Sequence, residues 1–72
     1  MNEFIYSICI KGSTYPGLIF AMSKKDAENK VIYMYQEHIS HDINNMAFND
    51  FKHLLYQECN ISLSDIFNIN EL

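Results

Sequence analysis

Residues 14–30, TYPGLIFAMSKKDAENK, contain the end of a turn, a strand and the start of a helix, and they decide the fold. They overlap the segment GSTYPG (residues 12–17), which holds every Gly and Pro of the chain and therefore predicts a loop. The apolar run LIFAM (residues 18–22) has the length and composition of a strand. Ser23, followed by Asp26 three residues later, matches the pattern that caps the beginning of a helix.

Residues 3–11, EFIYSICIK, precede the loop and alternate as a strand does, with Phe4, Tyr6, Ile8 and Ile10 on one face. Two strands joined by a loop of about six residues predict an antiparallel hairpin. Helices are expected to cover one face of this hairpin. We expect the uncovered face to carry four small or apolar side chains: Ile5, Cys9, Ile19 and Ala21.

Two helices are predicted after the hairpin. From Ala27 to Ile39 the apolar residues recur at helical spacing over an arc of roughly 160°, so this helix should contact its sheet and a second surface, either the next helix or another chain. A second helix is expected from about Met46 to Cys59. The tail, residues 60–72, fits either a strand or a short helical turn, and we favour the turn. The fold class is therefore α+β, a β-hairpin packed by two amphipathic helices (ββαα), in one domain of residues 1–72.

The size of the chain predicts self-association. A domain of 72 residues has a thin core and often relies on a second subunit. We expect a homodimer or a higher homo-oligomer, formed by pairing of strand edges or by packing of the uncovered sheet face.

The charge distribution argues against direct binding of duplex nucleic acid. The chain has no Arg, and residues 31–72 carry one Lys against six acidic residues, whereas backbone phosphates require clustered basic side chains. Two Cys are too few for a disulfide scaffold and suggest free thiols. No signal peptide and no apolar run of membrane-spanning length is visible, so we expect a cytoplasmic protein without a membrane partner.

Part of the sequence resembles small phage-encoded proteins that have no assigned function. The resemblance covers residues 4–55 and lies in Tyr15-Pro16-Gly17, Phe20-Ala21, Ser23, Ala27, a Tyr-rich helix and FNDFKHLL (residues 48–55). It implies an origin in a phage or mobile element, with a bacterial host cell as the location. It also implies a role in binding a host protein or in sequestering a small molecule. The chain departs from these proteins at residues 24–28, KKDAE, where they are often richer in Lys and Arg.

No set of residues predicts catalysis or a cofactor. His38, His41 and Asp42 form H-x-x-H-D, but zinc needs three or four converging ligands, and we interpret His38 as a core residue. Cys9 and His38 could meet in space, yet Cys9 lies within a strand and lacks an oxyanion loop. We therefore expect a protein that is not an enzyme and that binds no metal or cofactor.

The first functional hypothesis is an inhibitor that binds a host defence protein, as an anti-CRISPR or another counter-defence protein does. Exposed Tyr and acidic side chains would form a patch complementary to a basic surface, and its candidate residues are Tyr33, Glu37, Asp50 and Tyr56. We favour this hypothesis because Arg is absent and the longer part of the chain is acidic.

The alternative is a sponge that sequesters a nucleotide second messenger at a homo-oligomer interface. Tyr15 would stack on a base, and Lys24 and Lys25 would hold a phosphate at the start of the first helix. A structural or regulatory subunit is a third possibility that the sequence leaves open.

Overall fold

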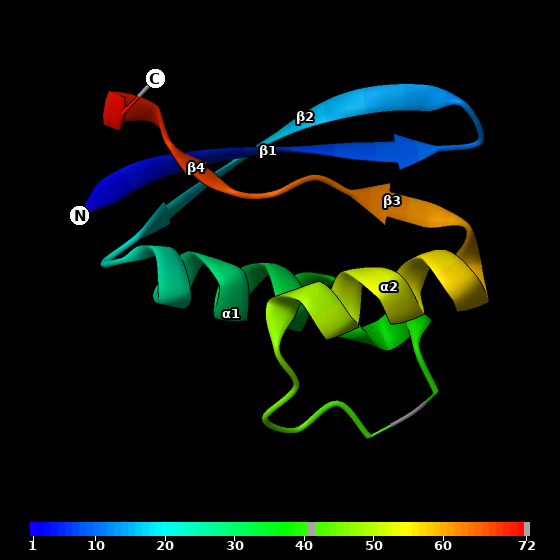
Figure 1. The fold of residues 1–72 in the computed structure, drawn as a ribbon. Helices are drawn as coiled ribbons and strands as arrows, with labels where there is room; N and C mark the ends of the chain where they lie inside the picture. Colours follow the sequence, from blue (N-terminus) through cyan, green and yellow to red (C-terminus); the bar gives the residue numbers. More distant parts are fainter. Residues whose placement is uncertain (41, 72) are drawn as a thin grey trace.

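Over residues 1–40 and 42–71, which the computed structural model describes, the chain forms one antiparallel sheet of four strands and two α-helices. Both helices cover the same face of the sheet (Figure 1). The predicted α+β fold is confirmed. The elements, in chain order, are β1 (Asn2–Ile10), β2 (Ser13–Ala21), α1 (Lys24–Tyr35), α2 (Phe48–Cys59), β3 (Ile61–Leu63) and β4 (Phe67–Asn68), with short 3-10 turns at Gln36–His38 and Ile69–Glu71.

The turn between β1 and β2 is shorter than predicted. It consists of Lys11 and Gly12 alone, with φ of 51° and 83°, and Ile10 pairs directly with Ser13. Positive φ at both positions is the type I′ geometry that two-residue hairpins favour, because its twist matches that of the strands. The predicted loop over residues 12–17 was therefore wrong, since Ser13 to Gly17 belong to β2.

Pro16 lies within β2 because β2 is an edge strand. The order of the sheet is β2-β1-β3, and Pro16 is opposite Ser7. In a two-residue hairpin the hydrogen-bonded pairs alternate outward from Ile10–Ser13, so the backbone of residue 16 points away from β1. The missing N–H of Pro16 therefore removes no bond of the ladder.

The register also decides which face each side chain of β2 occupies. Phe4 is opposite Ile19, and cross-strand partners share a face. Ile19 and Ala21 consequently point into the core, at 9% and 0% exposure, while Leu18 and Phe20 point outward. The prediction that Ile19 and Ala21 lie on the uncovered face was wrong. Both faces of β2 are apolar, so only the pairing with β1 distinguishes them.

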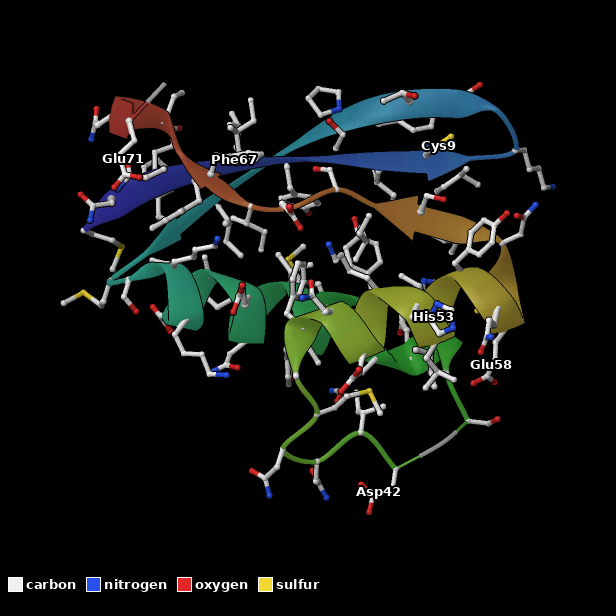
Figure 2. The ribbon with its side chains drawn as sticks, in the orientation of Figure 1. Cys9, Asp42, His53, Glu58, Phe67 and Glu71 are labelled. Carbon is white, nitrogen blue, oxygen red and sulfur yellow. The ribbon has the colours of Figure 1, made fainter. Side chains whose placement is uncertain are left out.

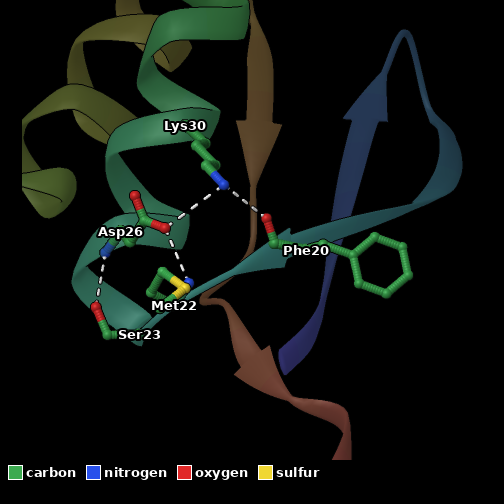
Figure 3. A network of polar contacts seen from close by, with 5 residues as sticks. All are labelled: Phe20, Met22, Ser23, Asp26 and Lys30. Atoms are coloured by element: carbon green, nitrogen blue, oxygen red, sulfur yellow. Dashed lines mark hydrogen bonds and ion pairs between the residues drawn. The ribbon is translucent and has the colours of Figure 1, made fainter. Parts of the chain in front are cut away.

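A hydrogen-bonded network ties the end of β2 to the start of α1 (Figure 3). The Asp26 N–H donates to Ser23 Oγ at 3.1 Å, as the predicted cap requires, and the Met22 N–H donates to Asp26 Oδ2 at 2.9 Å. Lys30 Nζ lies 3.5 Å from Asp26 Oδ2 and donates to the Phe20 carbonyl at 2.8 Å. The bond from Met22 lowers the pKa of Asp26, and Lys30 lowers it further.

The end of the chain returns to the sheet. The backbone reverses at Asn60, which has a left-handed φ of 57°, and β3 then pairs with β1 on the side opposite β2. Ile66 is 1% exposed and fills the core between the strands and the helices. The predicted helical turn is correct only for Ile69–Glu71. The strand alternative holds for Ile61–Leu63 and Phe67–Asn68, which cover the edge of β1 that we expected to be open.

The two helices end close to their predicted positions, with one difference in burial. α1 ends at Tyr35, and Ile39 beyond it is still buried at 8% exposure. His38 is exposed, so its interpretation as a core residue was wrong. α2 contributes Phe51 and Leu55, both fully buried, and its Lys52 pairs with Asp65, which lies between β3 and β4.

Candidate interaction surface

The face of the sheet opposite the helices is the most distinctive surface of the molecule. Neither of the two described α-helices covers it, and three large apolar side chains stand on it: Leu18 (58% exposed), Phe20 (59%) and Phe67 (50%). Phe67 and Cys9 both lie on the side of the sheet away from the helices (Figure 2).

These side chains form one continuous patch because of the strand register. Ile5 on β1 is the cross-strand partner of Leu18 on β2 and of Phe67 on β4, so the three residues make a row across the sheet. Phe20 follows two residues after Leu18 on the same face, opposite Glu3. We call Ile5, Leu18, Phe20 and Phe67 the outer-face patch.

The surroundings of the outer-face patch carry little charge. The outward positions between Ile5 and Cys9 on β1 and between Thr14 and Phe20 on β2 hold only apolar or neutral polar residues. Glu3 is the charged residue on this face of the two strands, at the end where β1 begins. The net charge of −4 therefore arises mainly from acidic residues on other parts of the molecule.

The free edge of β2 is obstructed at several positions, which bears on the expected pairing of strand edges. Pro16 has no N–H to offer an added strand, and Lys30 occupies the Phe20 carbonyl. The Met22 N–H, just beyond the strand, is bonded to Asp26. A strand that approached this edge would find the N–H missing at Pro16 and the carbonyl of Phe20 already bonded. Both gaps in the row of backbone donors and acceptors disfavour the pairing of two β2 edges.

The candidate residues of the acidic, aromatic patch are all exposed, but they do not form one surface. α1 lies under β2 and α2 under β3, on either side of the central strand β1. Tyr33 lines a shallow hollow of about 330 Å³ with Ile19 and Lys30, beside the free edge of β2. This side of α1 faces away from α2, which carries Asp50 and Tyr56.

Glu37, the fourth residue of that predicted patch, lies in the 3-10 turn after α1. Residues 42–47, which lead into α2, run on the side of the helices remote from the sheet (Figure 1). Residues 31–51 contain Glu37, Asp42 and Asp50 but no Lys or Arg. We call Glu37, Asp42 and Asp50 the acidic connection. Two of the predicted patch residues, Glu37 and Asp50, belong to it, and both are exposed.

One subunit does not assemble the predicted nucleotide site. Tyr15 lies near the start of β2 and Lys24 and Lys25 lie beyond its end, and the six residue steps of strand from Tyr15 to Ala21 alone span about 20 Å. In addition, the Asp26 carboxylate already places a negative charge at the start of α1, where a phosphate would have to bind.

The described residues contain no group of three or more His, Cys, Asp or Glu side chains suited to hold a metal ion. His41 of the H-x-x-H-D motif lies outside the described residues. Cys9 is on the outer face of the sheet, whereas His38 follows α1 on the other side, so these two residues do not meet. His38 instead accepts a hydrogen bond at its carbonyl from Cys59 Sγ, at 3.0 Å.

Neither of the two α-helices in the described chain, each of 12 residues, has the length and apolar character needed to cross a bilayer.

Comparison with known proteins found no matching family model, and neither a curated protein nor a solved structure matched the chain. The resemblance to phage-encoded proteins stays a prediction, and the functional interpretation depends on the surfaces of this chain.

Sequence reasoning missed Leu18, Phe20 and Phe67 as surface residues. The signal that could have identified them is the dipeptide Lys11-Gly12 between two apolar runs, because a two-residue turn there fixes Leu18 opposite Ile5.

Proposed function

We propose that this chain is a non-catalytic binding protein that contacts another protein through its outer-face patch. The observation that carries this proposal is the group of three large apolar side chains, each at least half exposed, on a sheet face that no described helix covers. Contiguous exposed apolar patches mark interaction sites in small domains, and Phe is enriched in such sites.

Inhibition of a host defence protein is a separate and more specific prediction, because it would use the acidic connection and not the outer-face patch. The acidic connection with Glu37, Asp42 and Asp50 supports a partner with a basic surface, because opposite charge accelerates association and suppresses wrong partners. Sequestration of a nucleotide stays the alternative, and it would require residues from more than one subunit.

A site-specific photo-crosslinking experiment tests the proposed function. Benzoylphenylalanine is placed at Phe20 or Phe67, and at Tyr33 as a control that is more exposed (74%) but lies on α1. After irradiation in bacterial cells, we expect adducts with a second polypeptide from positions 20 and 67 and not from position 33. The absence of adducts at 20 and 67, or equal yields at position 33, would contradict the proposal.

A further inference from the structure

We propose that the outer-face patch is covered by a second copy of this chain, which gives a face-to-face dimer of two stacked sheets. This inference depends on the proposed function, namely that this face binds protein, and it names the partner. The two-fold axis would run between the sheets along the row of Leu18, Ile5 and Phe67, across the strands.

Charge favours a second copy as the occupant. A chain with a net charge of −4 repels its own copies wherever acidic surfaces meet, but the outer-face patch carries no charge. A basic partner would find three acidic residues, Glu37, Asp42 and Asp50, on the helical side, whereas near the outer-face patch the acidic residues are Glu3, opposite Phe20, and Glu71, which lines a hollow with Phe67 and Lys24. The sheet face therefore suits an equally uncharged surface, and the patch of another copy is such a surface.

The register distinguishes between the two ways in which the patches can meet. With the axis across the strands, each residue of the row faces its own copy, Phe20 faces Pro16 of the partner subunit, and Glu3 faces the partner's Ser7. With the axis along the strands, Glu3 would face the partner's Glu3. Two carboxylates that face each other across an interface repel, so the axis across the strands is the preferred one.

The area of the patch sets the expected strength of association. An aromatic side chain presents roughly 150–250 Å², so the exposed halves of Phe20 and Phe67 together with Leu18 amount to about 300 Å² per copy. A pair thus buries roughly 600 Å² of apolar surface from these residues, less than the roughly 1,000 Å² that stable interfaces exceed. We therefore expect a weak, reversible monomer–dimer equilibrium.

The obstructed edge of β2 disfavours one competing mode of self-association. Pairing of β2 with its copy would need the donors and acceptors that Pro16 lacks and that Lys30 occupies. Stacking of the outer faces uses none of these groups, so it is compatible with the network at the start of α1.

Oppositely charged substitutions at Leu18 test the dimer and its axis. Leu18 is exposed, so Leu18→Asp and Leu18→Lys should leave the fold intact, which circular dichroism verifies. Across the proposed axis each substitution would place two like charges face to face. By light scattering after size exclusion, over about 10–500 μM, we expect the unmodified chain to dimerise and either variant alone to remain monomeric. An equimolar mixture of the two variants should recover the dimer, because Asp then faces Lys.

Tyr33→Asp is the matched control, because it adds the same charge at an exposed position on α1 and should dimerise normally. A monomeric unmodified chain throughout this range would overturn the inference, and so would a dimer that survives Leu18→Asp. Recovery of the dimer by Leu18→Asp mixed with Phe67→Lys, but not with Leu18→Lys, would overturn the proposed axis.

The crosslinking result separates this inference from the proposed function. Adducts at Phe20 that contain only a foreign polypeptide, together with a monomeric chain, would contradict the second copy and leave the binding function supported. Adducts with the mass of two copies of this chain support both.

Discussion

Gly17 is the residue whose side-chain size is most tightly restricted. It lies opposite Tyr6, and a Cβ atom at this position would overlap the Tyr6 ring. The Tyr6 ring is buried, and its hydroxyl lies 3.4 Å from the hydroxyl of Tyr35. Burial raises the pKa of Tyr6, and the hydrogen bond with Tyr35 raises it further. The φ of Gly17 is not in the left-handed region, so the restriction comes from packing and not from the backbone.

We therefore predict that Gly17→Ala lowers the free energy of unfolding by about 1–3 kcal/mol, the usual cost of overpacking. Urea denaturation followed by circular dichroism measures this change. In a Tyr6→Ala background the ring is absent, so the same substitution should cost much less. Equal costs in both backgrounds would show that the Tyr6 ring is not the cause.

Asp26 gives the stability of the protein an acid dependence. Its pKa is lowered from the ordinary value of 3.8, first by the bond from the Met22 N–H and then by Lys30. The unfolded chain therefore binds a proton at a higher pH than the folded chain does. The stabilising contribution is complete above the unfolded pKa and is lost as the pH falls through the lower folded pKa.

We expect Asp26→Asn to weaken the loss of stability below about pH 4, as urea titrations at several pH values would measure. Ser23→Ala is the control, since it removes the cap but keeps the carboxylate, and it should lower stability at every pH. Asp65, whose pKa is lowered by its bond from Lys52, should supply acid dependence in both variants. An unchanged pH profile in Asp26→Asn would contradict the assigned role.

Among the elements, the β-hairpin depends on two residues with positive φ. Lys11 adopts a φ of 51°, a conformation that Asn and Gly tolerate better than Lys does. We predict that Lys11→Asn raises the free energy of unfolding by about 0.5 kcal/mol, measured by urea denaturation. Lys11→Gln is the matched control, because it removes the same charge without the preference for positive φ, and it should produce no gain.

The sequence predicted elements best where local chemistry decides them. Ser23 and Asp26 gave the correct start of α1, and the helix expected from about Met46 to Cys59 agrees with α2 at Phe48–Cys59. β2 was harder, because Pro16 and Gly17 indicate a turn unless the strand is known to lie at an edge. The short strands β3 and β4 depend on pairing with β1, a long-range contact that no local pattern determines.

At the scale of the whole molecule, the candidate surface could not be predicted from composition. Leu18 and Phe20 have the residue types of a core, and only the hairpin register places them outside. The acidic connection was predictable in part, because Glu37 and Asp50 were recognised as surface residues. The expected proximity of Tyr33 and Tyr56 failed because α1 and α2 lie under opposite sides of the sheet.

The separation of Tyr15 from Lys24 and Lys25 leads to a prediction about nucleotides. Cyclic dinucleotides should not raise the melting temperature of the protein, because a ligand raises it only by binding the folded state. A thermal-shift assay at millimolar nucleotide provides the measurement, with Lys24→Ser as the comparison. A shift that disappears in Lys24→Ser would favour the sponge over the protein-binding function.

Pro16 and Lys30 also limit how far assembly proceeds. A sheet with an open border recruits further strands one after another, and such growth leads to fibres. Here Pro16 and Lys30 interrupt that border at β2, while in the proposed dimer the outer face meets one neighbour. Two stacked copies would therefore be disfavoured from recruiting a further strand at β2, although this strand carries no charged residue.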